Sequence, residues 1–472
     1  MITFLVSIGL LILGYFTYGK VVEKIFGIEE NRKTPAIELE DGVDYVPMKG
    51  WKIFLIQFLN IAGLGPIFGA IAGALWGPIA YLWIILGSIF AGGVHDFFSG
   101  MLSVRHAGAS ASEIVGTYLG NTIKQIMRVF TVVLLILVGV VFVTGPAGLL
   151  NNLTNWSTNM WVIAIILYYL FATVLPVDKI IGKVYPIFGL SLMIMAIGIG
   201  FNLIFKGYNM PEMTFSNLHP ASTPIFPFLF ITIACGAISG FHATQSPMMA
   251  RCLTNERQGR KIFYGAMIAE GIIAMVWAAA AMSFYNGTNG LSEVLANGGP
   301  AVVVNEISNT LMGKIGGILA VLGVIAAPIT SGDTAFRSAR LTIADSFKLN
   351  QRKPLNRYLI AIPLFIVGFA LTKINFSIIW RYFSWSNQTL AMIVLWAAAA
   401  YLAFNKKNHW ITTIPAIFMT AVTVSYILQA PEGFKLNSLF SNIVGIIIAI
   451  VFFILFISRI KKTKIEPLTD EI

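Results

Sequence analysis

The pentapeptide Ala62-Gly63-Leu64-Gly65-Pro66 interrupts an apolar run, residues 52–77, that is otherwise long enough to cross a membrane. Pro66 removes one backbone hydrogen bond and its ring clashes with the preceding turn, while the two glycines let the chain unwind. In hydrocarbon the freed N–H and C=O groups need partners, so such a break is tolerated only inside a helix bundle or beside a water-filled cavity. The stretch therefore predicts a discontinuous membrane helix.

A second interruption lies in the apolar run 224–250, where residues 235–247 read CGAISGFHATQSP. Ser246 followed by Pro247 predicts the N-cap and first turn of a restarted half-helix. A single Gly/Pro kink is also explained by close helix packing. Here, however, each break opens a block of five predicted spans, residues 52–205 and 224–404. Because five is odd, the second block crosses the membrane in the opposite sense, which predicts an inverted repeat with the substrate where the broken helices meet.

The composition places the whole chain in a membrane. Of its 472 residues 57% are hydrophobic and only 11% are charged, with a mean hydropathy of +0.79. This balance excludes soluble and disordered classes and predicts an all-α membrane protein. Hydropathy and helix breakers predict thirteen spans, which are 2–19, 52–77, 79–104, 126–150, 159–176, 182–205, 224–250, 262–286, 313–336, 355–373, 376–404, 410–428 and 437–459.

The net charge of +11 is explained by orientation. In the thirteen-span arrangement 27 of the 32 basic residues fall on one side and Arg381 falls inside a span; the other side has four, Lys206, Lys314, Lys373 and Lys435. The positive-inside rule then places the N-terminus outside and the C-terminus in the cytoplasm. We expect the bilayer, and no nucleic acid, as the partner of these charges. Residues 1–51 and 410–472 are predicted to add one and two further helices to the repeat. Cys235 and Cys252 show no metal spacing, so we expect them to be packing residues.

Five motifs between residue 41 and about residue 345 resemble a known family. They are Asp41-Gly42-Val43-Asp44-Tyr45-Val46-Pro47, Ala62-Gly63-Leu64-Gly65-Pro66, His95-Asp96-Phe97-Phe98-Ser99-Gly100, Ser239-Gly240-Phe241-His242-Ala243, and Pro328-Ile329-Thr330-Ser331-Gly332-Asp333-Thr334-Ala335-Phe336-Arg337. Together these motifs resemble the carbon starvation protein A family. The resemblance implies a carrier in the bacterial inner membrane for pyruvate, or for peptides, with a fold of the leucine-transporter type and no enzyme activity.

A leucine-transporter type of fold also implies a place for a sodium ion as the coupling ion. In that fold, carbonyls of the first broken helix and hydroxyls of the eighth core helix hold the ion, and a hard cation prefers such oxygens. The matching residues here are Leu59, Ala62, Ala327, Thr330 and Ser331. From the residues alone, a Thr-Ser pair is more often a hydrogen bond between helices or back to the preceding turn. No other cofactor is expected.

Ionisable residues inside the spans are costly, so each needs an explanation. Asp96 and Glu270 suit proton coupling, and His242, inside the second break, suits either coupling or contact with an anionic substrate. Asp333 lies four residues before Arg337, which favours a salt bridge over a coupling role. Arg381 suits bidentate binding of a carboxylate or, within its Trp and Tyr neighbours, anchoring at the membrane interface.

These features predict an alternating-access symporter for a small carboxylate. The N–H groups of Ile67, Phe68 and Gly69 and those after Ser246 would present positive helix ends to the anion. The predicted substrate-binding residues are Gly63, Gly65, Pro66, Ile67, Ser239, Gly240, His242, Gln245 and Arg381; the predicted coupling residues are Asp96, His242, Glu270 and Asp333. The sequence leaves proton against sodium coupling open. A channel and a nutrient sensor are the alternatives, and an intramembrane aspartyl protease is disfavoured because its signatures are absent.

Overall fold

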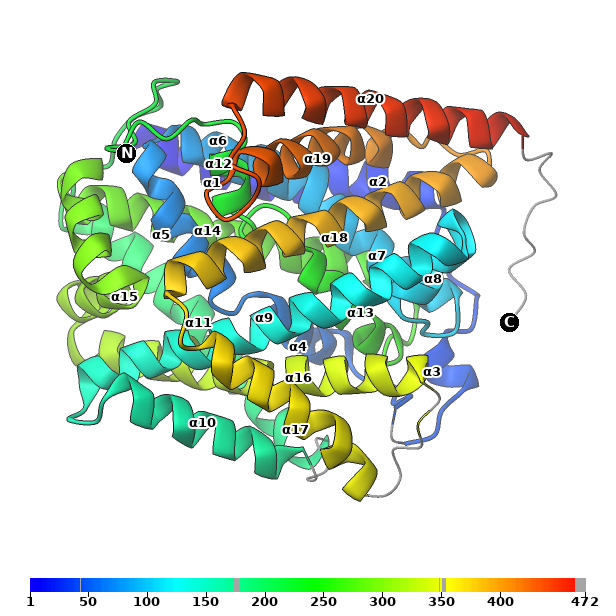
Figure 1. Cartoon of the computed structure of the whole chain (residues 1–472), viewed down its shortest axis with the longest axis horizontal. Helices are drawn as coiled ribbons and strands as arrows, with labels where there is room; N and C mark the ends of the chain where they lie inside the picture. The colour runs from blue at the N-terminus through cyan, green and yellow to red at the C-terminus, as the bar shows by residue number, and fades with distance from the viewer. Residues whose placement is uncertain (43, 174–177, 348, 350–353, 463–472) are drawn as a thin grey trace.

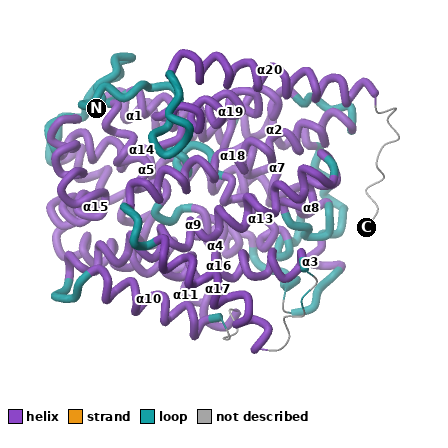
Figure 2. The backbone as a smooth tube through the Cα atoms, viewed as in Figure 1, coloured by secondary structure: helices purple, strands orange, loops and turns teal. Residues whose placement is uncertain are grey.

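The computed structural model describes residues 1–42, 44–173, 178–347, 349 and 354–462, and helices are the regular elements throughout them (Figure 2). Val43 of the first motif, the end of the span 159–176 and residues 463–472 of the tail lie outside the described residues. The helices are α1 (Ile2–Phe16), α2 (Tyr18–Phe26), α3 (Pro35–Glu38), α4 (Gly50–Ile61), α5 (Gly65–Gly73), α6 (Ile79–Leu86), α7 (Gly93–Arg105), α8 (Ala111–Leu119), α9 (Asn121–Leu153), α10 (Thr158–Ala172), α11 (Asp178–Phe205), α12 (Phe228–Thr232), α13 (Gly240–Ala250), α14 (Gly265–Phe284), α15 (Thr288–Ala320), α16 (Ala327–Ser346), α17 (Pro354–Leu371), α18 (Phe376–Phe404), α19 (Trp410–Gln429) and α20 (Ser438–Lys462).

The described residues contain nine helices long and apolar enough to cross a membrane, or ten when the bent pair α4–α5 counts as one span. Two shorter apolar helices, Thr158–Ala172 and Leu355–Leu371, stand beside them. The structure therefore confirms an all-α membrane protein but not the count of thirteen. One difference is residues 288–312, which the sequence assigned to no span. They are helical and belong to α15, which is kinked at Gly299 and Gly313, where φ is 68° and 60° and only glycine is unstrained.

The first predicted break is confirmed. α4 ends at Ile61 and α5 begins at Gly65, and the two halves are bent by 48°. Pro66 stands in the first turn of α5, where its missing N–H costs nothing because that donor has no partner within a helix. One detail is wrong. The N–H of Phe68 donates to the carbonyl of Leu64 at 2.8 Å, so it is not free for an anion.

The second break is present but lies earlier in the chain than predicted. α12 ends at Thr232 and α13 begins at Gly240, with Ser239 in an extended conformation as the N-cap residue. Ser246 and Pro247 lie inside α13, so they do not start the half-helix. The Ser246 hydroxyl instead donates back to the carbonyl of His242 at 3.0 Å. Pro247 has no N–H for the carbonyl of Ala243 four residues earlier, and a proline inside a membrane helix is tolerated where neighbouring helices surround it.

Three glycines of α5 bring the two broken helices into contact. A Cβ added to Gly65 would lie 2.3 Å from Cβ of Cys235, one on Gly69 3.1 Å from the carbonyl oxygen of Thr232, and one on Gly73 2.2 Å from Ile233. The three glycines recur every four residues and so share one face of the helix. Small residues at this spacing let two helix backbones approach closely. The first break is therefore pressed directly against the second.

The long helices run between two ends of the molecule (Figure 1). One end has the N-terminus, α12 and the kinked segment of α15; the other has α2, α3 and α8. The end of α20 lies opposite to the N-terminus. α20 covers one edge and exposes a row of large apolar side chains, including Leu439, Ile447 and Leu455, as expected for a surface that faces lipid.

Candidate transport site

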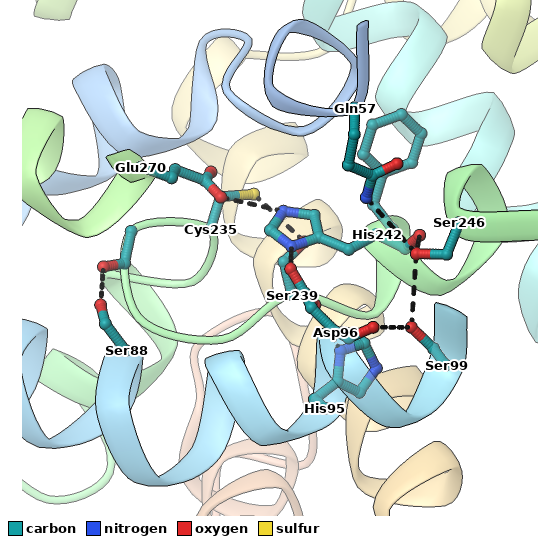
Figure 3. A network of polar contacts seen from close by, with 12 residues as sticks. Gln57, Ser88, His95, Asp96, Ser99, Cys235, Ser239, His242, Ser246 and Glu270 are labelled. Atoms are coloured by element: carbon teal, nitrogen blue, oxygen red, sulfur yellow. Dashed lines mark hydrogen bonds and ion pairs between the residues drawn. The ribbon is translucent and has the colours of Figure 1, made fainter. Parts of the chain in front are cut away.

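A group of buried ionisable side chains lies where α7, α13 and α14 meet (Figure 3). Nδ1 of His242 lies 2.7 Å from Oδ2 of Asp96, and its Nε2 lies 3.3 Å from Oε2 of Glu270. Nδ1 of His95 contacts the other oxygen of Asp96 at 2.8 Å. All four side chains have no exposed surface. We call Asp96, His242 and Glu270 the charge relay. It joins α7, α13 and α14, so it connects the second break to helices of both predicted blocks.

The break itself surrounds the His242 end of the relay. Cys235 lies beside His242 and Glu270, and one ligand atom from each of the three lies within 4.8 Å of the others. Such a separation occurs in metal centres and also in hydrogen-bonded relays. Here Sγ of Cys235 donates to the Ser239 hydroxyl at 3.5 Å and accepts from Nδ2 of Asn387 at 3.2 Å. The thiol is thus hydrogen-bonded within the break, which favours a hydrogen-bonded relay over a metal centre.

Neutral polar side chains continue from the relay toward the end that contains α2. The hydroxyl of Ser246 accepts from Nε2 of Gln57 and from the hydroxyl of Ser99, at 3.4 Å each. All three side chains are buried. Polar groups are rare in hydrocarbon unless they face a bundle interior or a pathway. A continuous group of polar side chains therefore joins α4, α7 and α13 on the α2 side of the relay, and we call it the polar lane.

An ion-pair network closes this lane at the α2 end. The guanidinium of Arg105, at the end of α7, contacts Glu256 through two nitrogens at 2.5 and 2.9 Å and Glu29 at 2.9 Å. It also donates to the carbonyl of Gly27 at 3.0 Å. Arg105 and Glu256 are almost completely buried. A bidentate buried pair of this kind is rigid, and removing one partner leaves an uncompensated charge.

The opposite end is hollowed by a cavity of about 920 Å³, which we call the vestibule. Its walls include exposed Asn297 in the kinked segment of α15, and it reaches down to buried Phe68 and Trp380. His219, in the loop before α12, also lines it. Burial lowers the pKa of His219, so this imidazole is neutral at the vestibule at physiological pH. The cavity thus lies at the end with the N-terminus, and the buried ion pair of Arg105 with Glu256 lies at the end with α2.

The structure brings together only part of the predicted site. Gly65 and Gly240 lie in the two breaks, against Cys235 and Asn387 respectively, and Gly63 is packed against the ring of Phe142. Pro66 and Ile67 are buried in the first turn of α5. Gln245 is buried and donates to Thr244. Ser239, His242, Asp96 and Glu270 belong to the relay and its surroundings.

Two predicted residues lie outside the relay. Arg381 lines the vestibule and pairs with Glu432 at 3.0 Å. Asp333 pairs with Arg337 at 3.4 Å, which confirms the predicted i,i+4 salt bridge. The side chains of Arg381 and Asp333 are thus both paired with opposite charges, and neither contacts the relay.

The residues of the implied sodium place divide into two groups. Leu59 and Ala62 lie at the end of α4 beside the first break, while Ala327, Thr330 and Ser331 open α16. The Thr330 hydroxyl donates back to the carbonyl of Ala327 at 2.7 Å, which is the local bond expected from the residues alone. The buried hydroxyl of Ser331 has no hydrogen-bond partner among the described residues.

Sequence reasoning missed three parts of the site. Cys235 was expected to be a packing residue, and His95 was given no role of its own. The contact of Asn387 with the break was not foreseen because it joins residues 146 to 152 positions apart. One signal in the sequence could have indicated the contact between the two breaks: Gly65, Gly69 and Gly73 recur every four residues and face Cys235, Thr232 and Ile233.

Comparison with known proteins places the chain in a family. A family model described as carbon starvation protein CstA matches residues 1–151, 145–308 and 278–426. An uncharacterised membrane protein of Haemophilus influenzae is 44% identical over 63% of this chain and 95% of its own length. The peptide transporter CstA of Bacillus subtilis is 27% identical over 97% of this chain and 96% of its own length. The pyruvate/proton symporter BtsT of Escherichia coli is 28% identical over 58% of this chain and 48% of its own length.

A solved structure supports the fold. The manganese transporter of Eremococcus coleocola aligns with 90% of this chain and 99% of its own, with a TM-score of 0.57. Sequence identity is 14%, so this likeness shows the fold alone.

Proposed function

Because the chain belongs to the family of carbon starvation protein CstA, we propose that it is a secondary transporter that carries a carboxylate-bearing nutrient, a short peptide or pyruvate, through the bacterial inner membrane. It is not an enzyme; its named relatives are transporters. The observation that carries the proposal is the buried charge relay between an open vestibule and a closed end. A carrier needs such an arrangement because its central site must never be open to both sides at once.

The proton is the coupling ion in this proposal. Two carboxylates and two imidazoles without exposed surface cannot hold an uncompensated charge, since that costs several kcal/mol at this depth. The relay keeps its charge balanced by exchanging protons as its contacts change. Nδ1 of His242 bonds Asp96, and Nε2 lies 3.3 Å from Glu270 without an aligned hydrogen bond, so in this proposal the proton passes to Glu270 when these two side chains realign. Asp333 serves as a salt-bridge latch in α16.

The substrate binds where the two broken helices meet. Helix N-termini favour anions, and α5 and α13 both begin there, at Gly65 and Gly240. The start of each helix and the residues beside it form the binding surface, with Gly63, Pro66 and Ile67 on one side and Ser239, His242 and Gln245 on the other. Arg381 meets the incoming carboxylate in the vestibule by exchanging Glu432 for it. In this proposal each break lies in the first helix of one half of an inverted repeat. The halves are residues 52–205 and 224–404, and residues 1–51 and 410–472 lie outside the repeat.

The vestibule faces the outside of the cell in this proposal. Arg251, Arg260 and Lys407 lie with Arg105 at the α2 end, where they contact Gly108, Glu23 and Phe26. Basic residues concentrate on the cytoplasmic side of membrane proteins, so the α2 end and the C-terminus are cytoplasmic. The structure is then the outward-open state of the carrier.

Sodium coupling is the second candidate. It is favoured by the buried Ser331 hydroxyl, which lacks a hydrogen-bond partner in the described part of the chain, because a hard cation prefers such oxygens. Leu59 and Ala62 would supply the oxygens of the first break. The two couplings predict different driving gradients, so one experiment separates them.

Uptake into proteoliposomes tests the proposal. We expect an inward proton gradient, with the membrane potential clamped, to drive accumulation of pyruvate or of alanyl-alanine; a sodium gradient should add nothing. Glu270→Gln removes the acidic end of the relay and should abolish gradient-driven uptake while leaving exchange of labelled for unlabelled substrate. Glu38→Gln, at an exposed position in α3, is the matched control and should behave like the parent. Failure of every gradient to drive uptake of any small carboxylate would exclude symport.

A further inference from the structure

Asn387 of α18 contacts both sides of the second break. Its Oδ1 accepts from the backbone N–H of Phe241 at 2.6 Å and from the hydroxyl of Ser239 at 3.1 Å. Its Nδ2 donates to Sγ of Cys235 at 3.2 Å. The side chain has no exposed surface, and three of its hydrogen-bonding positions are used within the break. One amide therefore joins the chain before the break to the chain after it.

The contact with Phe241 takes the place of a helix cap. α13 begins at Gly240, so Phe241 is its second residue, and that N–H has no acceptor within the helix. An N-cap side chain ordinarily accepts this bond, but Ser239 makes no capping bond and donates its hydroxyl to Asn387 instead. Asn387 thus caps α13 from another helix. His242 follows in the same turn, so the cap fixes the turn from which the central residue of the charge relay projects.

α13 packs directly on the backbone of α18 at this point. A Cβ added to Gly240 would lie 2.3 Å from the carbonyl oxygen of Asn387 and 2.6 Å from the backbone nitrogen of Ala391. Backbone atoms cannot move aside as a flexible side chain can. The neighbouring Gln388 donates to the carbonyl of Phe230 in α12, so α18 holds both halves of the broken helix.

We propose that Asn387 is a positioning residue for proton coupling: it fixes the conformation of the second break and orients His242 between Asp96 and Glu270. The effect of Asn387 on proton coupling rests on the proposed function. Its effect on the conformation of the break does not depend on any substrate. We predict that loss of the Asn387 amide loosens the break around Cys235 and uncouples transport from the proton gradient more than it impairs transport itself.

The thiol of Cys235 reports on the break directly. The chain has two cysteines, so Cys252→Ser leaves Cys235 as the single thiol. In detergent-purified full-length protein we expect Asn387→Ala to raise the rate of Cys235 alkylation by N-ethylmaleimide about tenfold, because local opening of the break controls access to a buried thiol. Asn387→Asp keeps the acceptor for Phe241 and loses the donor to Cys235, so its alkylation rate should lie between those of the parent and Asn387→Ala. An unchanged rate in both variants would overturn the proposal.

The matched control is Thr389→Val on the same helix. The Thr389 hydroxyl donates only to the carbonyl of Trp385 in its own helix at 2.8 Å, so its loss should leave the alkylation rate within about twofold of the parent. Should Asn387→Ala fail to fold, Asn387→Asp with the same control still decides the question. Equal acceleration by Thr389→Val would show general loosening of α18 and would overturn the role assigned to Asn387.

Transport then separates positioning from general damage. In proteoliposomes Asn387→Ala should lower uptake of pyruvate or alanyl-alanine driven by a proton gradient by about tenfold or more, while exchange of the same probe falls by less than about threefold. An equal fall in both would contradict the positioning of His242, even if the thiol result holds. Absence of any uptake by the parent protein would instead refute the proposed function and leave the alkylation result to judge the contact.

Discussion

The two helix breaks solve the same physical problem with different means. Around the first break, residues 62–64, the close neighbours are apolar or small: the ring of Phe142 covers Gly63, and Cys235 lies against Gly65. Around the second, residues 233–239, side chains from other helices bind the backbone. Nε1 of Trp83 donates to the carbonyl of Ile233 at 3.1 Å, and the hydroxyl of Ser88 donates to that of Gly236 at 3.1 Å. The first break is fixed by shape and the second by hydrogen bonds.

This difference assigns the two breaks different tasks. A break that depends on packing tolerates no added volume but carries no charge, so it can shape a binding surface. A break clamped by polar side chains can hold ionisable groups such as His242 in one orientation despite the cost of burial. The first break thus depends on packing and the second on polar contacts, and the predictions below test that comparison.

The largest effect is expected from Gly65→Ala. The new Cβ would lie 2.3 Å from Cβ of Cys235, which belongs to the opposing broken helix, so one of the two helices must move. Overpacking of this kind costs about 1–3 kcal/mol, and more where the backbone cannot yield. We expect a clearly lowered thermal unfolding temperature in detergent and loss of substrate exchange.

Two variants give this prediction its controls. Adding Cys235→Gly removes the opposing Cβ and should recover much of the stability, since the two changes share one contact. Gly9→Ala in α1, where an added Cβ meets nothing within 4 Å, should be neutral or stabilising by about 0.5–1 kcal/mol. A mild Gly65→Ala variant would mean that the first break is not held by shape.

A middle effect is expected from Ser88→Ala at the second break. The change adds no volume, but it leaves the buried carbonyl of Gly236 without its side-chain donor, which costs about 1–3 kcal/mol. Thermal unfolding of the purified protein measures the loss. Ser441→Ala is the matched control, because that buried hydroxyl bonds only the carbonyl of Asn437, the residue just before its own helix. Equal stability of the two variants would remove the distinction between the breaks.

The sequence predicted what depends on local chemistry and missed what depends on distant contacts. Gly63, Gly65 and Pro66 located the first break, which begins at Ala62 as predicted and ends at Leu64, two residues before Pro66, because proline and glycine act on their own backbone. The second break was misplaced: Ser246-Pro247 has the local pattern of a helix start, but the cap that decides the start comes from Asn387. Ionisable residues in apolar runs identified the relay members Asp96, His242 and Glu270. Their mutual contacts, and the pairing of Arg381 with Glu432, depend on tertiary packing that no local pattern contains.

The smallest effect is expected outside both breaks, at Glu113 in α8. This side chain forms partly exposed ion pairs with Lys124 and Arg128 and contacts neither break. Burial opposes ionisation of Glu113, but hydrogen bonds and charge from Lys124 and Arg128 outweigh it and hold the pKa of Glu113 below its usual value of 4.5. A lowered folded pKa means that the contribution to stability is present above about pH 4.5 and is lost as the pH falls further. The pair is 43% exposed on the Glu113 side, so solvent screening limits it to at most about 1 kcal/mol.

Glu113→Gln should therefore flatten the pH dependence of thermal unfolding only below about pH 4.5, without affecting substrate exchange at neutral pH. High salt should shrink the difference between parent and variant, because partly exposed charges are screened. A variant at this position that impaired coupled uptake as strongly as Glu270→Gln would break the comparison, since it would extend the coupling function from the clamped interior to a surface ion pair.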